Sequence, residues 1–252
     1  MYEEMLSAVD RKCTELCHQP DPDVFMTDFE TAVMQAARLV FGDSITTRGC
    51  FFHLTQATWR KIQEVGLAAT YRSDESFRHF CGMLDGLAFV PVAQVKVAMA
   101  YLRSVMPGNA SDLVSYFDAN YVSGTSRQTD HGERRVPARF PPTTWNMHDA
   151  TIRGTDRTNN TSEAWNNHFQ HLIGHKHPSI WRLIEALQAD AAEASSKQLR
   201  HAVGTLSPKR RSKAAKAHQE RLQRLCTELN AGKRSLSDFM QAIGHCIRIS
   251  CT

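Results

Sequence analysis

Residues 23–59 read DVFMTDFETAVMQAARLVFGDSITTRGCFFHLTQATW, and this stretch decides the fold of the N-terminal part of the chain. Its pattern predicts a strand, an acidic turn, a helix, a second strand and a second helix. Val24, Phe25 and Met26 form a short apolar run that is typical of a buried strand. At Asp28 the side-chain period changes from two to about 3.6, so a helix follows. A carboxylate is thereby placed at the carboxyl end of a strand, where ligands collect in open α/β sheets.

The second predicted strand runs from Ile45 to His53, and a helix follows it to Leu67. Cys50 and His53 form a C-x-x-H pair at the end of this strand. One interpretation is half of a zinc site, which requires four ligands and usually has a matching distal pair. No second pair at such a spacing stands out in the sequence. This favours the other interpretation, a buried thiol and a polar histidine at a strand end.

A second carboxylate, Glu163, lies in the run TNNTSE (158–163), where a helix is predicted to begin and to extend to Ile173. Both acids have two interpretations. Asp28 either caps a helix from Phe29 to Phe41 or binds Mg²⁺ or Mn²⁺, which prefer carboxylate oxygens. Glu163 either forms a capping pair with Asn160 or is another ligand of such an ion. Residue types alone favour the caps.

The rest of the chain is predicted to be mainly helical. Ser73 is the expected N-cap of a helix, and Ser235 with Asp238 forms a capping pair before the last helix. The segment Trp145–Arg153 is ambiguous between a strand and irregular chain. The polar segment Ser123–Pro142 is expected to be an exposed loop, and it carries four arginines: Arg127, Arg134, Arg135 and Arg139.

Composition excludes several classes of protein. The 252 residues suffice for one large domain or two small ones, with apolar content that is ordinary for a globular chain. No run of eighteen apolar residues exists, so we expect no membrane span. The acidic N-terminus lacks the layout of a signal peptide. Seven irregularly spaced cysteines predict buried thiols in a reducing compartment rather than a disulfide framework.

Positive charge is concentrated in residues 197–234, where eleven lysines and arginines are opposed by two glutamates. A basic helix is predicted to open at Ser207-Pro208. Its cations either form a solvated face or bind a polyanion such as nucleic acid. The run PKRRSK (208–213) also resembles a nuclear-import signal. The candidate nucleic-acid-binding residues are Lys209, Arg210, Arg211, Lys213 and Lys216.

Taken together, these motifs resemble the Mutator-like element (MULE) transposases. The resemblance is colinear from about Tyr2 to Trp181. It rests on TDFETA (27–32), GCFFHLTQATW (49–59), LAFVP (87–91), YF (116–117) with Tyr121, FP (140–141) with WN (145–146), and RTNNTSE (157–163).

The resemblance implies a DDE transposase with an RNase H-like core, in which three acidic residues bind two Mg²⁺ or Mn²⁺ ions. One ion activates water or a 3′-hydroxyl, and the other stabilises the leaving oxygen. Asp28 matches the second acidic position, and Glu163 matches the third. Cys50 and His53 match the family's C-x-x-H signature. DNA is the implied partner, and chemistry at two DNA ends is compatible with a homodimer.

The chain departs from the family at the first aspartate, which the family carries on an earlier strand in a D-[GA]-T setting. Asp10 lies in a predicted amphipathic helix, and Asp149 lies far downstream. Because two metals need several carboxylates to fix their positions, we expect this chain not to cut or join DNA by itself. The expected core is truncated, with about two strands and without its N-terminal part.

The predicted fold is therefore mainly α with a small β component. Residues 1–67 form the partial RNase H-like core, residues 68–156 a helical insertion with an exposed loop, residues 157–203 the helix with Glu163 and a long helix, and residues 204–252 basic C-terminal helices. The predicted function is that of a MULE-type DDE transposase-derived protein, catalytically incomplete without the first aspartate. The alternative is a non-enzymatic nuclear DNA-binding protein derived from a transposase.

Overall fold

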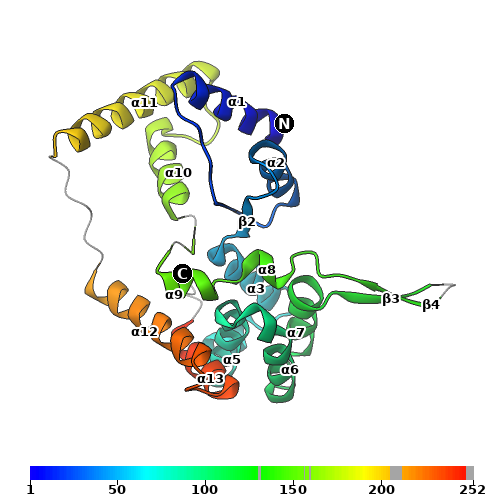
Figure 1. The fold of residues 1–252 in the computed structure, drawn as a ribbon. Helices are drawn as coiled ribbons and strands as arrows, with labels where there is room; N and C mark the ends of the chain where they lie inside the picture. The colour runs from blue at the N-terminus through cyan, green and yellow to red at the C-terminus, as the bar shows by residue number, and fades with distance from the viewer. Residues whose placement is uncertain (130–131, 156, 159, 205–211, 248–252) are drawn as a thin grey trace. The chain divides into compact units, whose positions relative to one another are not determined.

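A computed structural model describes residues 1–129, 132–155, 157–158, 160–204 and 212–247. For Thr129, Asn160, Thr161 and Glu163 it describes the backbone alone. The described chain is mainly helical with a small β component, as the sequence predicts, and its strands form two two-stranded sheets, of which only the first was expected (Figure 1). It divides into two compact units, Met1–Thr158 with Ala217–Thr252, and Asn159–Lys216. None of the described helices combines the length and apolarity needed to cross a membrane.

The first unit begins with a strand–helix–strand arrangement preceded by a helix. Its elements are α1 (Tyr2–Glu15), β1 (Val24–Thr27), α2 (Thr31–Phe41) and β2 (Thr46–Gly49). The two strands pair in parallel, with Val24 opposite Thr46 and Thr27 opposite Gly49. Leu6 of α1 is buried in a small apolar cluster with two alanines of α2. This pair of strands is the sheet predicted for the N-terminal part.

The second strand is shorter than predicted. It ends at Gly49, and α3 (Phe51–Glu64) begins two residues later. Leu54, Thr58 and Ile62 recur every four residues along α3 and are all buried. Because that spacing fits one helical face, it places residues 51–53 in the first turn of a helix rather than in a strand.

The main core of the first unit lies among helices. It is built from α3, α4 (Ala68–Ser73), α5 (Glu75–Gly86), the short turn η1 (Leu87–Phe89), α6 (Val95–Val105), α7 (Ser111–Phe117), η3 (Asp118–Val122), α8 (Pro142–Trp145), α12 (Lys213–Asn230) and α13 (Leu236–Cys246). The turn η2 (Val92–Gln94) precedes α6 and has no buried residue. Its largest fully buried side chains include Trp145, Tyr71, Phe77, Phe80 and Phe89. Apolar burial of this extent is the main source of the unit's stability.

Helices α5 and α13 approach each other closely through glycines. A Cβ on Gly82 would collide with the carbonyl oxygens of Gly244 and Ile247. A Cβ on Gly244 would lie 2.6 Å from Cγ of Met83. The absence of side chains at these positions lets the backbones come together, so the C-terminal helix packs tightly on the middle of the chain.

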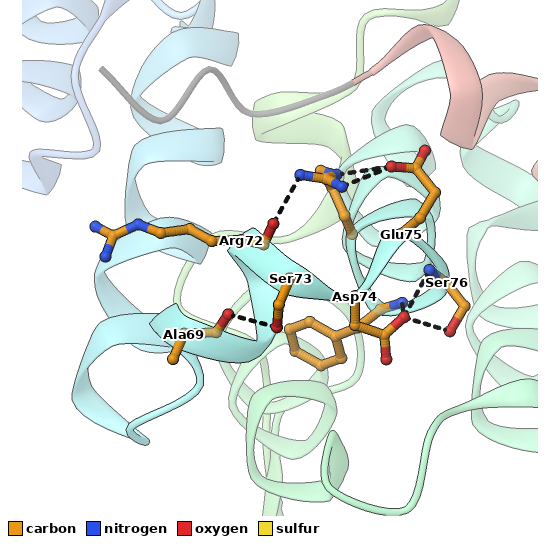
Figure 2. Close-up of polar contacts among 8 residues, drawn as sticks. Ala69, Arg72, Ser73, Asp74, Glu75 and Ser76 are labelled. Atoms are coloured by element: carbon orange, nitrogen blue, oxygen red, sulfur yellow. Dashed lines mark hydrogen bonds and ion pairs between the residues drawn. The ribbon is translucent and has the colours of Figure 1, made fainter.

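The helix α5 is capped by Asp74, not by Ser73 as the sequence suggested (Figure 2). The Asp74 carboxylate accepts hydrogen bonds from the backbone N–H groups of Ser76 and Phe77, at 2.8 and 3.2 Å. The Ser73 hydroxyl instead donates to the carbonyl of Ala69 within the preceding helix. Because α4 extends through Ser73, the cap position falls one residue later.

The segment predicted to be an exposed loop contains an antiparallel hairpin. Its strands are β3 (Thr125–Thr129) and β4 (Gly132–Val136), and the hairpin extends away from the helices around it (Figure 1). Every described side chain in Thr125–Gln128 and Gly132–Arg135 is exposed. The polar composition correctly indicated exposure, but it did not indicate strand pairing because neither face of the hairpin is apolar.

The ambiguous segment Trp145–Arg153 proves to be helical. It contains the end of α8 (Pro142–Trp145) and the whole of α9 (His148–Arg153). The indole N–H of Trp145 donates to the carbonyls of Tyr121 and Phe140, at 2.9 and 3.0 Å. The buried indole therefore fixes this segment in the core, which its local sequence pattern could not show.

The second unit contains α10 (Asn160–Ile173) and α11 (Ile180–Ala202). Trp165 stacks on Phe169, and its indole N–H donates to Asp190 at 3.0 Å. His168 Nε2 lies 3.0 Å from a carboxylate oxygen of Glu193. These contacts join the two helices, and α10 confirms the helix predicted for this part of the chain.

Two expected helix starts lie near the C-terminus. Ser235 caps α13 as predicted, accepting from the N–H of Asp238 at 3.1 Å. The proposed opening of the basic helix at Ser207-Pro208 lies outside the described residues. The described helix α12 begins at Lys213, and the Ser212 hydroxyl accepts from the N–H of Ala215.

A buried carboxyl group in this core yields a stability prediction. Asp85 is fully buried, burial raises its pKa from 3.8 to about 7, and a hydroxyl bond from Thr58 at 2.7 Å opposes part of that rise. Protonation of Asp85 therefore favours the folded chain. The stabilisation is complete below pH 4 and is lost as the pH rises toward 7, by up to about 4 kcal/mol.

We expect Asp85→Asn to remove this pH dependence, because the amide is neutral and similar in shape. The free energy of unfolding, measured by urea denaturation from pH 4 to pH 8, should fall less steeply in the variant than in the parent. Asp112→Asn, at an exposed position of α7, is the matched control. A difference between Asp85→Asn and parent that stays constant across this range would contradict the prediction.

Candidate functional site

The candidate site lies at the carboxyl edge of the parallel strand pair. Asp28 follows β1 and Cys50 follows β2, so both residues leave the sheet at the same edge. The ladder continues one step further, because the N–H of Cys50 donates to the carbonyl of Thr27 at 2.8 Å. This short segment of regular pairing fixes the distance between the ends of β1 and β2.

Asp28 does not occupy the N-cap position of the helix that follows it. The helix α2 begins at Thr31, and Glu30 is its N-cap residue. The carbonyl of Asp28 accepts from the N–H of Glu30 at 2.8 Å, which closes a tight turn between strand and helix. Asp28 is therefore not the N-cap residue of α2, and the capping interpretation is wrong.

The carboxylate of Asp28 lies beside the imidazole of His53. Their Oδ1 and Nδ1 atoms are 3.0 Å apart, within ion-pair distance but without the alignment of a hydrogen bond. The Asp28 side chain is 55% exposed and that of His53 is 23% exposed. His53 reaches this position because α3 starts just after β2, which places its third residue over the end of β1. The two residues form a solvent-accessible acid–imidazole pair.

Cys50 has a different environment from its partner in the C-x-x-H motif. Its side chain is fully buried, and the residue occupies the N-cap position of α3 without a side-chain capping bond. Across the part of the chain that the structure describes, no group of three or more His, Cys, Asp or Glu is arranged to hold a metal ion. The described residues therefore do not supply the four ligands of a structural zinc site.

A distant motif reaches the same helix start. The carbonyl of Arg157 accepts a hydrogen bond from the N–H of Phe51 at 3.2 Å, in the first turn of α3. The Arg157 guanidinium lies 5.6 Å from the ring centre of Phe89 and donates to Gln219 at 2.6 Å. The first residue of the RTNNTSE run is thus held at the helix that carries the C-x-x-H motif.

The position of Arg157 could not be predicted from the local sequence pattern. Its place in the RTNNTSE run indicated that it could matter for function. No local pattern shows that its carbonyl accepts a hydrogen bond from the first turn of another helix. The first four N–H groups of a helix lack partners within that helix, so such a bond stabilises the turn that carries His53. The structure thereby brings together Asp28, Cys50, His53 and Arg157.

The remaining predicted site residues are only partly described. Glu163 lies in α10, and the structure describes its backbone alone. Lys209, Arg210 and Arg211 lie outside the described residues. Lys213 and Lys216 are exposed in the first turns of α12. Their exposure is what a surface for a polyanion requires.

Further along α12, a positive surface adjoins Arg157. Arg221 and Arg224 are exposed, whereas Leu222 and Leu225 of the same helix are buried. Partial burial lowers the pKa of His218, and the charges of Arg157 and Arg221 lower it further. The outer face of α12 therefore carries Arg221 and Arg224 together with two acids, Glu220 and Glu228, and Arg224 lies 3.9 Å from Glu228.

The MULE resemblance implies Mg²⁺ or Mn²⁺, and the described residues give a partial test of that expectation. At the sheet edge they supply one carboxylate, Asp28, whose Oδ1 already contacts an imidazole. Two ions about 4 Å apart need several carboxylates to fix them. The described residues do not form a two-metal site by themselves, and we assign no reaction step to a metal.

Comparisons of the chain with protein-family models, with curated protein sequences and with solved structures gave no match. The motifs of this sequence and the contacts that join them are therefore the basis for a functional proposal.

The end of β2 yields a second stability prediction. A Cβ added to Gly49 would lie 2.6 Å from Cζ of Phe29. The Phe29 ring is itself held edge-on by Phe140 and Tyr121, with ring centres 5.0 and 5.7 Å away. Because the ring has little room to move, Gly49→Ala should lower the free energy of unfolding by about 1–3 kcal/mol.

The measurement is urea denaturation followed by circular dichroism. Gly108→Ala is the control, because an added Cβ there meets nothing within 4 Å. We expect Gly108→Ala to stay within about 0.5 kcal/mol of the parent. Equal effects of the two substitutions would show that Phe29 yields easily and that its packing does not fix the sheet edge.

Proposed function

We propose that this chain is a MULE-type DDE transposase-derived protein that binds DNA. The observation that carries the proposal is the meeting of three motifs at one helix start. Asp28 contacts His53 of the C-x-x-H motif, and Arg157 of the RTNNTSE run is bonded to the same helix. In the resemblance to the family these motifs stand in a colinear order, and their contacts in the folded chain support the proposal.

The strand–helix–strand arrangement supports an RNase H-like origin for the N-terminal part. Its two strands are parallel and joined through α2, and the candidate acid follows the first of them. Parallel strands joined in this way direct functional groups to their carboxyl ends. In this proposal Asp28 and Glu163 are the second and third acids of the family, and Mg²⁺ or Mn²⁺ is the ion that they bind.

In this proposal, the chain does not cleave or join DNA by itself. DNA cleavage and strand transfer in the intact family depend on two metal ions held by three acids. Asp28 and Glu163 supply two of these acids, and the described residues add no third at the sheet edge. Because the in-line displacement depends on the position of both ions, two carboxylates would bind one ion weakly and place it poorly.

A second candidate function is that of a non-enzymatic nuclear DNA-binding protein derived from a transposase. The observation that favours it is the division of α12 into two faces. Its leucines are buried in the core, and Lys213, Lys216, Arg221 and Arg224 are exposed. Phosphate contacts from such a face give affinity that depends on salt and little on sequence.

The metal proposal predicts a specific calorimetric result. The parent chain should bind one Mn²⁺ weakly, and Asp28→Asn and Glu163→Gln should each reduce that affinity by at least about tenfold, or about 1.4 kcal/mol. Each amide keeps the side-chain shape but removes the negative charge that the ion requires. Asp43→Asn, at an exposed turn, is the matched control. Equal Mn²⁺ affinity in the parent and both site variants would show that the carboxylates do not share an ion.

The DNA proposal predicts a measurable salt dependence. Fluorescence anisotropy with a labelled duplex should give an affinity that falls steeply as salt rises. The double variant Lys213→Ala/Lys216→Ala should bind more weakly and should reduce the slope of log affinity against log salt by about 2, about 0.9 for each lost phosphate contact.

The control for this experiment is Lys12→Ala, at an exposed lysine of α1 that is paired with Glu15. It removes one positive charge from another surface and should leave the slope unchanged. A duplex affinity that does not change with salt concentration would contradict the DNA proposal. An equal loss of duplex affinity in the control would show that only net charge matters.

A further inference from the structure

The hairpin β3–β4 carries a pair of arginines that face each other across the strands. In its register Arg127 lies opposite Arg134, and Ser126 lies opposite Arg135. Directly opposed residues of an antiparallel pair point to the same face, and neighbours along a strand alternate. One face, here called the arginine face, therefore holds Thr125, Arg127, Arg134 and Val136.

The two faces of the hairpin differ in charge. Among its described side chains, the arginine face has two positive charges and no negative one. The opposite face holds Ser126, Gln128, Glu133 and Arg135, so its one cation is balanced by one acid. Like charges directly opposed across strands destabilise a hairpin. The opposed Arg127 and Arg134 therefore destabilise the hairpin unless an anion lies between their guanidinium groups.

The base of the hairpin is firmly fixed. Gly124 has a φ of +80°, and a Cβ there would collide with the carbonyl of Val136, so this entry to β3 requires glycine. On the other side, the N–H of Phe140 donates to the carbonyl of Asn120 at 3.0 Å, and the buried Trp145 indole donates to Phe140. The exposed strands consequently extend from an anchored base, away from the helices around them (Figure 1).

We propose that the arginine face of β3–β4 is a contact surface for duplex DNA. This inference rests on the proposed function, since it adds a second binding element to a DNA-binding chain. A two-stranded ribbon fits within the major groove, about 12 Å wide, and guanidinium groups bind phosphates and base edges. The described hairpin residues include no aromatic side chain, which binding of single strands by stacking would require.

The test compares two variants in the full chain by fluorescence anisotropy on a labelled duplex over a salt series. Arg127→Ala/Arg134→Ala should lower the affinity by at least about tenfold and reduce the salt slope by about 2, for two lost phosphate contacts. Arg135→Ala removes an arginine from the opposite face and should change the affinity by less than about threefold. Because all three residues are exposed, circular dichroism should show the parent fold in both variants.

The outcomes separate this inference from the proposed function. If the parent chain does not bind the duplex, the proposed function fails, and with it the inference that rests on it. If the parent binds but the double variant behaves like Arg135→Ala, the arginine face is not the contact surface and only this inference is overturned. A double variant that loses binding to anionic phospholipid vesicles while keeping its duplex affinity would also overturn it.

Discussion

The packing of one ring, that of Phe29, connects the parts of the first unit that matter for function. Phe29 follows Asp28 directly, and its ring lies against Gly49 at the end of β2. On its other sides it meets Tyr121 and Phe140 edge-on. Because protein interiors are close-packed, this contact fixes the position of the strand pair relative to the helical core. The sheet of two strands is too small to be stable alone, so its edge depends on that packing.

The same contact relates the candidate site to the root of the hairpin. Phe140 lies just after the end of β4, and Tyr121 belongs to η3, which precedes β3. The turn that carries Asp28 and the base of the hairpin β3–β4 therefore contact each other through one aromatic cluster. A second connection is made by Arg157, whose carbonyl is bonded to the start of α3. Together these contacts hold motifs from separate parts of the sequence in fixed relation.

The sequence predicted the parts of the fold that local pattern determines. The β1–α2–β2 order follows from the change of period at Asp28, and the cap at Ser235 follows from residue type. Contacts between distant residues could not be read in this way. The bond from Phe51 to Arg157, the burial of Trp145 and the pairing of Arg127 with Arg134 all depend on tertiary packing or on register. Ser73 was mistaken for a cap because helix ends are set by the neighbouring turn as well as by residue type.

The two cationic surfaces do not carry equal weight as evidence for DNA binding. On α12 the apolar face is buried in the core, so the helix needs polar residues on its outer face whatever its function. Arg221 and Arg224 satisfy that need as well as lysine or glutamate would. The hairpin has no buried face to balance, and uncharged polar residues would pair across its strands without repulsion. Arg127 opposite Arg134 breaks a local rule of strand pairing with no structural gain among the described residues, and such exceptions are expected at functional sites. For this reason the hairpin, although smaller and less basic than the C-terminal region, is the stronger argument that the chain binds a polyanion.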